Sequence, residues 1–451
     1  MNSFSAQYLV ITIFICFVVT GQIQAQEDTT SAEETKKGWT FGALPAIAYD
    51  TDRGFKYGGL VNFFNYGDGR TYPDYLQSIY LEWSRTTKGS GINQLRFDTE
   101  RLTRNTPVRL TVDLSYFTEK SMDFYGFNGY ESVYQPEFKE KNADDYITRM
   151  FYRYGRNLFH FSAIFQNQIP NTDFKWLAGI ENFTHKLDEF DFERYNQKSN
   201  DDRLRDTITL FELYKKWGLI SQEESDGGIV NYLKAGMVYD TREQKANPMK
   251  GMWSEILLSA APGFLWNNDY QYLKLSCIHR QYFTLVPEDL NLALRIGYQG
   301  TILGKAPFYM QSYLMSSYTE SVNVEGLGGQ KSLRGIQRNR ILGDDIAYSN
   351  IELRWKFWRF NLFNQNIYIA LSGFWDNGMV VDPIDLDKSK IPQNIHKDRY
   401  FTDMQEGIHS AIGTGLHFAL NNNFIVALDY GRALDERDGT DGLYIGLNFL
   451  Y

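Results

Sequence analysis

The sequence predicts an all-β fold, a 16-stranded antiparallel transmembrane β-barrel with long extracellular loops. Three observations support this prediction. Apolar and polar residues alternate in short segments from Trp39 to the last residue, Tyr451. The 451 residues include 32 Phe, 31 Tyr and 9 Trp but only 11 Pro. A short apolar run near the N-terminus has the length of an export signal.

Composition and charge exclude several other classes of protein. The formal charge is −9 and basic runs are absent from the sequence, which argues against nucleic acid as a partner. The aromatic content is too high for a disordered chain. The mean hydropathy of −0.42 is too low for a bundle of membrane-spanning helices. A β-barrel tolerates such a value, because only half of each strand is apolar.

The first residues predict export from the cytoplasm. Residues 8–19 form a mostly apolar core that is too short to span a membrane as a helix. Cleavage after Ala25 would make residues 1–25 a signal peptide, although the segment before the core lacks Lys and Arg. Polar residues 26–38 are expected to be a disordered periplasmic lead-in, and 39–451 the barrel. The mature chain then has one cysteine, Cys277, which rules out an intrachain disulfide.

The alternation itself separates a barrel from a soluble β-sandwich. In residues 290–298 and 351–357, large apolar residues occupy every second position. The side chains between them include Arg295, Glu352, Arg354 and Lys356. A charged face is typical of a barrel lumen, whereas the apolar and aromatic face would meet lipid. The last strand would place Leu443, Ile445, Leu447, Phe449 and Tyr451 on one face.

Counting these segments gives 16 strands, and the connections between them alternate in length. Links such as 286–288 and 421–423 are short, whereas 119–156, 187–228, 302–345 and 377–408 are long. Short periplasmic turns and long outer loops are typical of outer-membrane barrels. The expected strands are 40–50, 55–65, 74–86, 91–101, 107–118, 157–168, 174–186, 229–240, 252–261, 270–284, 289–301, 346–357, 366–376, 409–420, 424–431 and 442–451.

Local features elsewhere have simpler interpretations than a functional site. Leu210, Leu213, Tyr214 and Trp217 recur at helical spacing and predict a short helix packed on the loop surface. Asp382, Asp385 and Asp387 lack the spacing of a known calcium site, so we expect a solvated acidic loop. Cys277 shares a face with leucines and is expected to be an inert lipid-facing thiol. The sequence predicts no metal site and no cofactor.

Several motifs in the second half of the chain occur in a familiar order. They are Val238-Tyr239-Asp240-Thr241-Arg242, Leu333-Arg334-Gly335-Ile336, Tyr348 to Arg354, Gly373-Phe374-Trp375-Asp376-Asn377-Gly378 and Gly413-Thr414-Gly415-Leu416. Together they resemble the BamA/TamA-type bacterial surface-antigen superfamily of 16-stranded outer-membrane barrels. Residues 229–451 carry this resemblance, and residues 39–186 match mainly by their strand pattern.

The resemblance implies a lumen loop held by an ion pair. In the family, the loop with the Arg-Gly motif folds back into the lumen, and its Arg pairs with the Asp of the later strand motif. Arg334 and Gly335 would be the loop residues, and Phe374 and Asp376 would be the wall residues, with Glu352 nearby. Guanidinium suits this role because its planar fork binds a carboxylate through two hydrogen bonds. The spacing of these residues by itself leaves another interpretation open, in which Arg334 is an exposed loop residue and Asp376 is an unrelated charge in the lumen.

The resemblance also implies a weak seam between the first and last strands. Pro45 removes a hydrogen-bond donor from the first strand, which suits an edge. The seam residues would be Pro45 with Gly446, Phe449 and Tyr451, the last three lying in a stretch that resembles a barrel assembly signal. Family members are thought to open here for substrate strands or lipid. A short first strand without a gating role is the alternative.

One departure from the family pattern affects the expected function. Assembly and translocation members carry periplasmic POTRA domains, and residues 26–38 leave no room for one. We therefore expect a member without POTRA domains, with outer-membrane lipid around it and a periplasmic partner that recruits substrate. The expected function is non-enzymatic assistance of protein insertion, protein translocation or lipid handling. A passive pore is the alternative. A hydrolase is disfavoured because neighbours His409 and Ser410 would lie on opposite faces of a strand.

Overall fold

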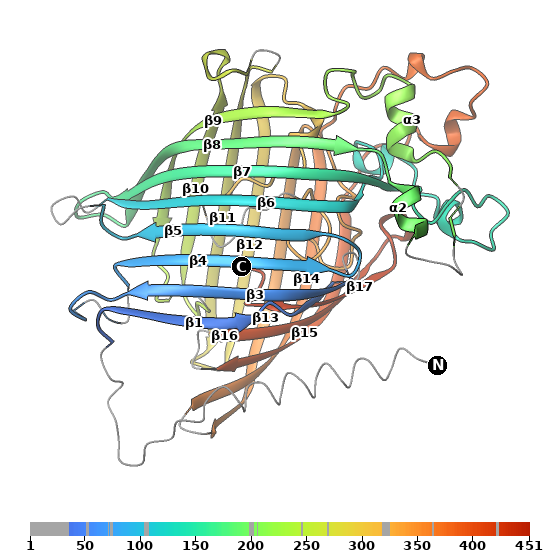
Figure 1. Cartoon of the computed structure of the whole chain (residues 1–451). Coiled ribbons are helices and arrows are strands. Elements are labelled where there is room, and N and C mark those ends of the chain that lie inside the picture. The colour runs from blue at the N-terminus through green and yellow to red at the C-terminus, as the bar shows by residue number, and fades with distance from the viewer. Residues whose placement is uncertain are drawn as a thin grey trace.

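A single closed sheet of antiparallel strands forms the barrel in the computed structural model (Figure 1). The structure describes residues 36–50, 54–70, 72, 75–102, 108–197, 203–204, 206–244, 247–267, 270–317, 325–362, 365–420 and 424–451. The expected signal peptide and most of the expected lead-in lie outside these residues. Among the described helices, none is long and apolar enough to cross a membrane.

The strands follow the predicted order, with one break in the first of them. The bounds are β1 Trp39–Pro45, β2 Ala48–Asp50, β3 Gly54–Asn65, β4 Gln77–Thr86, β5 Gly91–Thr99, β6 Arg109–Asp123, β7 Arg153–Gln168, β8 Phe174–Asp188, β9 Gly227–Asp240, β10 Gly251–Ala261, β11 Tyr272–Val286, β12 Leu290–Gly304, β13 Asp345–Leu362, β14 Gln365–Asp382, β15 His409–Leu420, β16 Phe424–Ala433 and β17 Asp441–Leu447.

The sixteen predicted spans are confirmed, because β1 and β2 together make one span. Both pair with β3, and residues 46–47 separate them directly after Pro45. Proline cannot donate to a ladder, which accounts for a break at this point. Several strands extend further than predicted toward the long loops, and β13 and β14 form a hairpin of 18 residues each.

The last strand is shorter than predicted, and this corrects the sequence reading. β17 ends at Leu447, and Asn448 turns the chain with a φ of 64°. Phe449 and Tyr451 are buried in the barrel interior and do not share the outward face of Leu447, which is 50% exposed. The alternating pattern continues to residue 451, but the strand does not, because Phe449 and Tyr451 make side-chain contacts inside the barrel instead.

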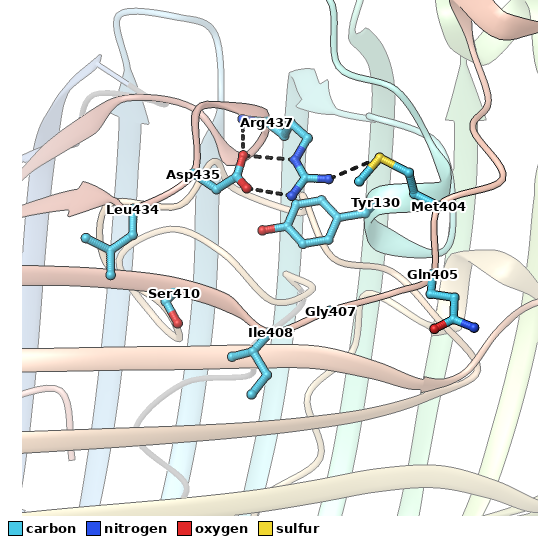
Figure 2. Close-up of a pocket in the computed structure, with 9 residues that line it drawn as sticks. All are labelled: Tyr130, Met404, Gln405, Gly407, Ile408, Ser410, Leu434, Asp435 and Arg437. Carbon is cyan, nitrogen blue, oxygen red and sulfur yellow. Dashed lines mark hydrogen bonds and ion pairs between the residues drawn. The ribbon is translucent and has the colours of Figure 1, made fainter.

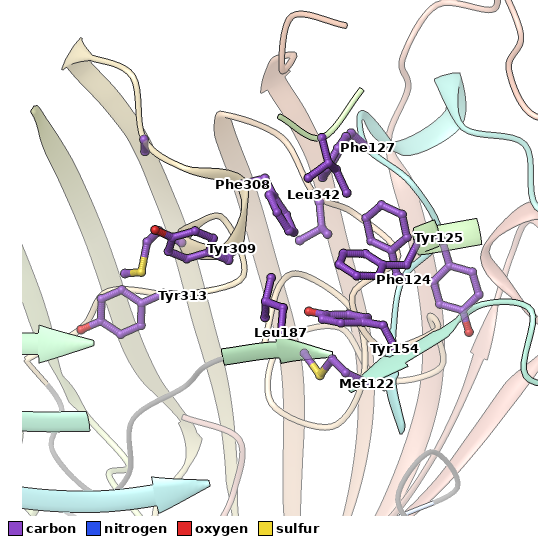
Figure 3. Packing of buried hydrophobic residues seen from close by; sticks show 14 of the residues in the cluster. Met122, Phe124, Tyr125, Phe127, Tyr154, Leu187, Phe308, Tyr309, Tyr313 and Leu342 are labelled. Atoms are coloured by element: carbon purple, nitrogen blue, oxygen red, sulfur yellow. The ribbon is translucent and has the colours of Figure 1, made fainter. Parts of the chain in front are cut away.

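The long loops fold together at one end of the barrel, where Figure 1 shows α2 (Phe192–Gln197) and α3 (Leu210–Lys216). Aromatic rings from several loops pack there, and Figure 3 shows Phe124, Phe127 and Phe308 among them. Tyr214 of the predicted helix lies edge-on to Phe124 at 5.1 Å. Short 3₁₀ helices occupy Gly129–Glu131, Pro136–Lys139, Gly263–Leu265, Phe308–Met310, Lys388–Lys390, Lys397–Arg399 and Glu436–Asp438.

This aromatic cluster makes the long-loop end a packed structure. Edge-on aromatic pairs each add about 0.5–1.5 kcal/mol to what their burial contributes. The fully buried rings include Phe151, Phe211 and Tyr214. At the opposite end, Asn247 of the connection between β9 and β10 reaches into the barrel, because its amide donates to the Tyr368 hydroxyl at 2.6 Å. Both ends of the lumen are therefore partly covered by the chain itself.

Candidate functional site

The lumen loop places Arg334 against three carboxylates of the barrel wall. Its Nε and Nη2 donate to the two oxygens of Asp376 at 3.0 and 3.2 Å, the two-pronged geometry of a guanidinium with a carboxylate. Nη2 also lies 3.0 Å from Glu352, and Nη1 lies 3.4 Å from Asp429. Arg334, Glu352 and Asp376 are each at most 1% exposed. A buried charge needs such compensation to be stable.

Strand alternation explains how these carboxylates converge. Glu352 on β13 is directly opposite Phe374 on β14, and Asp376 lies two residues further along the same inward face of β14. Asp429 reaches the same place from β16. The ring of Phe374 lies under the guanidinium, 3.5 Å from its central carbon, in a cation–π contact.

Backbone hydrogen bonds also hold the loop against the barrel wall. The Arg334 amide donates to Asp376 at 3.0 Å, and the Gly335 amide donates to the Tyr444 hydroxyl of β17 at 3.2 Å. Gly335 has a φ of 97°, and a Cβ there would lie 2.5 Å from the Arg432 nitrogen. Only glycine fits this approach of loop to wall without strain.

The electrostatics of Arg334 follow from this setting. Burial by itself would lower the pKa of the guanidinium, but Asp376, Glu352 and Asp429 raise it above its ordinary value. The group therefore stays charged, and it neutralises part of a cluster of three carboxylates. A second cation, Arg354, donates to Glu352 at 3.2 Å. Glu352 thus joins two arginines.

Two further arginines of the same loop were not singled out from the sequence. Arg338 donates to Asp123 of β6 at 2.7 Å, and Arg340 donates to the carbonyls of Gly129 and Ser132 at 2.8 and 3.0 Å. The loop thus binds the wall on both sides of the lumen. Asp429 carried only one signal in the sequence, its inward position on an alternating strand, whereas the two loop arginines carried none.

The seam between first and last strands is short. With residues 51–53 outside the described part of the chain, β17 pairs with β2 at two described positions, Tyr444 with Asp50 and Ile445 with Tyr49. By contrast, β16 and β17 pair at seven positions, and β12 and β13 at ten. Within the described residues, β1 pairs with β3 and not with β17. Pro45 therefore lies at an edge beyond the seam, and Gly446 directly follows the paired residues.

The other candidate groups among the described residues have the following partners. His409 is buried between Asp438 and Glu406, at 2.6 and 2.9 Å, whereas Ser410 donates to Asn377. Ser254 contacts His279 at 2.7 Å, but no described Asp or Glu bonds to this histidine. The oxygens of Asp344, Asp345 and Asp382 lie close enough together to hold a cation. Asp385 and Asp387, predicted to be solvated with Asp382, are not part of that group.

A pocket at the long-loop end is lined by Tyr130, Leu434 and Arg437, among others (Figure 2). The Arg437 guanidinium already has partners. Its Nε and Nη2 donate to Asp435 at 2.9 and 2.6 Å, and its face lies over the ring of Tyr130. The pocket therefore offers no unpaired charge from Arg437 to a ligand.

Comparison with known proteins identifies the family. Residues 77–450 match the model of the Omp85 superfamily domain. The chain belongs to this superfamily. It is accordingly a β-barrel of the outer membrane of a Gram-negative bacterium, and the long-loop end is extracellular. The resemblance inferred from the motifs is confirmed.

Solved structures support the same fold. The chain is similar to BamA from Haemophilus ducreyi lacking POTRA domains 1–3, with a TM-score of 0.53 and 15% identity over 92% of this chain and 71% of that one. It is also similar to CdiB from Escherichia coli, with a TM-score of 0.53 and 13% identity over 93% of this chain and 64% of that one. A comparison with curated proteins found no match.

Proposed function

We propose that this Omp85 barrel assists protein insertion, protein translocation or lipid handling in the outer membrane by opening between its first and last strands. The observation that carries the proposal is the seam between β17 and β2, which shows two residue pairs among the described residues. Breaking so few pairs costs far less than separating the ten pairs of β12 and β13. The unpaired edge of β1 would then meet the membrane, where unsatisfied backbone groups are costly and favour pairing with an incoming strand.

The lumen loop would keep the remaining wall rigid while the seam moves. Arg334 ties the loop to β13, β14 and β16, which lie on the β17 side of the seam. We propose that Arg334, Gly335, Glu352, Phe374 and Asp376 form this anchor. Pro45 and Gly446 would bound the part that opens. A periplasmic partner would bring the substrate to the barrel.

A locked seam tests the proposal. Tyr49→Cys and Ile445→Cys place thiols at directly opposite positions. Proteoliposomes with the purified barrel should accelerate folding of a denatured outer-membrane barrel or transfer of phospholipid when the disulfide is reduced, and lose that effect when it is oxidised. Ile256→Cys opposite the native Cys277 supplies a matched disulfide outside the seam, and its oxidation should change nothing. Activity that survives the locked seam would show that another route is used.

A passive pore is the second candidate and gives a different result. The lumen loop and the packed extracellular loops should restrict ion flow in planar bilayers, so conductance should be low and flickering. A large, steady conductance that Arg334→Ala leaves unchanged would favour the pore. Members of the superfamily are generally non-catalytic transport and assembly barrels, and we propose no reaction.

A further inference from the structure

On the outer face of the barrel, near its extracellular end, one charged side chain lies among lipid-facing residues. Arg432 of β16 and Leu434 are exposed, whereas the residues that alternate with them, Gly431 and Ala433, are buried. Since successive residues of a strand point to opposite faces, the Arg432 side chain points out of the barrel. In a membrane-spanning barrel the outward face meets lipid, so Arg432 places a cation close to the outer headgroup region.

The Arg432 guanidinium is available to a ligand. Within the described part of the chain, it forms no ion pair and no hydrogen bond. Asp441 of β17 is directly opposite Arg432 in the strand register, but the Asp441 carboxylate accepts from the Thr440 hydroxyl at 2.9 Å. An outward-facing arginine is less costly near a membrane surface than at the midplane, because its long stem lets the charged head reach the headgroups.

Large apolar side chains surround this cation on the same face. Trp375 of β14, Ile412 of β15 and Tyr430 of β16 are each nearly half exposed. In the strand register, Ile412 is directly opposite both Trp375 and Arg432. Tyr430 lies two residues before Arg432, toward the middle of the membrane. These three side chains form a surface on which acyl chains can lie directly beside the cation.

On the extracellular side of the cation lies the pocket of Figure 2, with a volume of about 340 Å³. Ile408, Ser410 and Leu434 are among its lining residues, and Gln405 adds an amide group. The Leu434 amide donates to the Ser410 carbonyl at 2.8 Å, so the pocket wall continues the sheet. Leu434 follows Arg432 by two residues, about 7 Å along a strand. One molecule can therefore contact both the pocket and the guanidinium.

The backbone of Arg432 is held from both neighbouring strands and from behind. It pairs with Ile412 on one side and with Asp441 on the other. On the lumen side, a Cβ on loop residue Gly335 would lie 2.5 Å from the Arg432 nitrogen. A ligand thus meets a cation whose main chain is already in place, which lowers the ordering that binding requires.

We propose that Arg432, the apolar side chains around it and the pocket at Leu434 bind a phosphorylated glycolipid of the outer leaflet. The planar guanidinium binds a phosphate through two hydrogen bonds. Acyl chains lie along Trp375, Ile412 and Tyr430, and part of the sugar headgroup enters the pocket. A lipid fits better than a protein partner because the cation belongs to the lipid-facing surface. The site requires neither an open seam nor a transported substrate.

Native mass spectrometry of the purified barrel in detergent tests the site, with diphosphorylated lipid A as the probe. Arg432→Gln should weaken the apparent affinity about tenfold or more, as expected for loss of a hydrogen bond to a charged group. Leu434→Asn should weaken it less, because the phosphate keeps its partner. Asp441→Asn should strengthen it, because a carboxylate beside the phosphate is removed. Unchanged gel mobility of the folded barrel checks that each variant folds.

Two control variants and two control probes make the test specific. Lys186→Gln removes an exposed cation at the extracellular end of β8 that lies 3.2 Å from Asp188, and it should leave the affinity unchanged. Arg109→Ala removes a lumen arginine whose ion pairs are with Asp98 and Glu100, and it should also have no effect. Lipid A without phosphates should bind native and Arg432→Gln barrels equally, and inorganic phosphate at the lipid concentration should not compete.

Each contrary result overturns the proposal. Equal affinity of the native and Arg432→Gln barrels for diphosphorylated lipid A shows that Arg432 does not bind the phosphate. An equal loss in Lys186→Gln shows general charge attraction. Competition by inorganic phosphate shows a site for a free anion. If lipid binding is equal but a protein co-purifies with the native barrel and not with Arg432→Gln, the surface is a protein interface instead.

Discussion

Replacing Arg334 by alanine should release the lumen loop from the wall. The change removes the charge that faces Asp376, Glu352 and Asp429, three buried carboxylates. Breaking one side of a buried ion pair costs about 3–5 kcal/mol, since the remaining charge is left without compensation. Because three carboxylates lose one shared cation, we expect the upper part of this range.

The loss can be measured at Ser332, which is 1% exposed and lies two residues before Arg334 in the same loop. Ser332→Cys should react slowly with a maleimide in the native loop. If reaction requires loop release, Arg334→Ala should speed it by about a hundredfold to a few thousandfold, at 1.4 kcal/mol for each factor of ten. Arg109→Ala is the control and should leave the rate within a few fold.

A double-mutant cycle decides whether Arg334 and Asp376 act as a pair. Asp376→Ala should reduce the free energy that holds the loop on the wall by less than Arg334→Ala does, because Arg334 keeps Glu352 and Asp429 as partners. The double variant should be no worse than the worse single one, since the second change has no intact pair to break. Fully additive losses would refute the pairing, whatever the distances.

Three other substitutions probe parts of the same loop. Gly335→Ala should speed the cysteine reaction because the new methyl group would clash with the β16 backbone at 2.5 Å, whereas Gly373→Ala, with nothing within 4 Å of its Cβ, should not. Phe374→Ala should lower stability by about 3–5 kcal/mol, seen as a lower temperature for loss of the folded band on gels. Arg338→Ala should expose the extracellular part of the loop to protease, because Asp123 loses the loop arginine and keeps Arg153 of its own wall; unchanged cleavage would show that Arg338 is not an anchor.

Much of the barrel could be predicted because its signals are local. Alternation with a period of two fixes which side chains face inward, and the charged side chains that it assigned to the lumen, Arg295, Glu352 and Arg354, are buried. Connection length fixed which end carries the long loops. Strand ends were less predictable: β13 and β14 run several residues past their predicted limits, because hairpin pairing continues where the alternation has faded.

The site was only partly visible in the sequence. The motif resemblance drew attention to Arg334 and Asp376, but Asp429, Arg338 and Arg340 had no motif to mark them. Their partners lie far away in the chain, and Arg338 and Asp123 are 215 residues apart. Contacts between a loop and a distant strand depend on how the loop crosses the lumen, which no local pattern specifies.

The sequence by itself determined the barrel, its strand count, its inward and outward faces and its family, because each depends on the order of nearby residues. Only the tertiary structure decided where residues 448–451 lie. Their pattern suits a strand that faces lipid, but Arg295, Arg354 and the Ala293 and Asn350 carbonyls hold Phe449 and Tyr451 inside. The position of residues 448–451 depends on whether contacts in the lumen or pairing with the first strand are more favourable. With these residues in the lumen, β1 is left without β17 as a neighbour among the described residues.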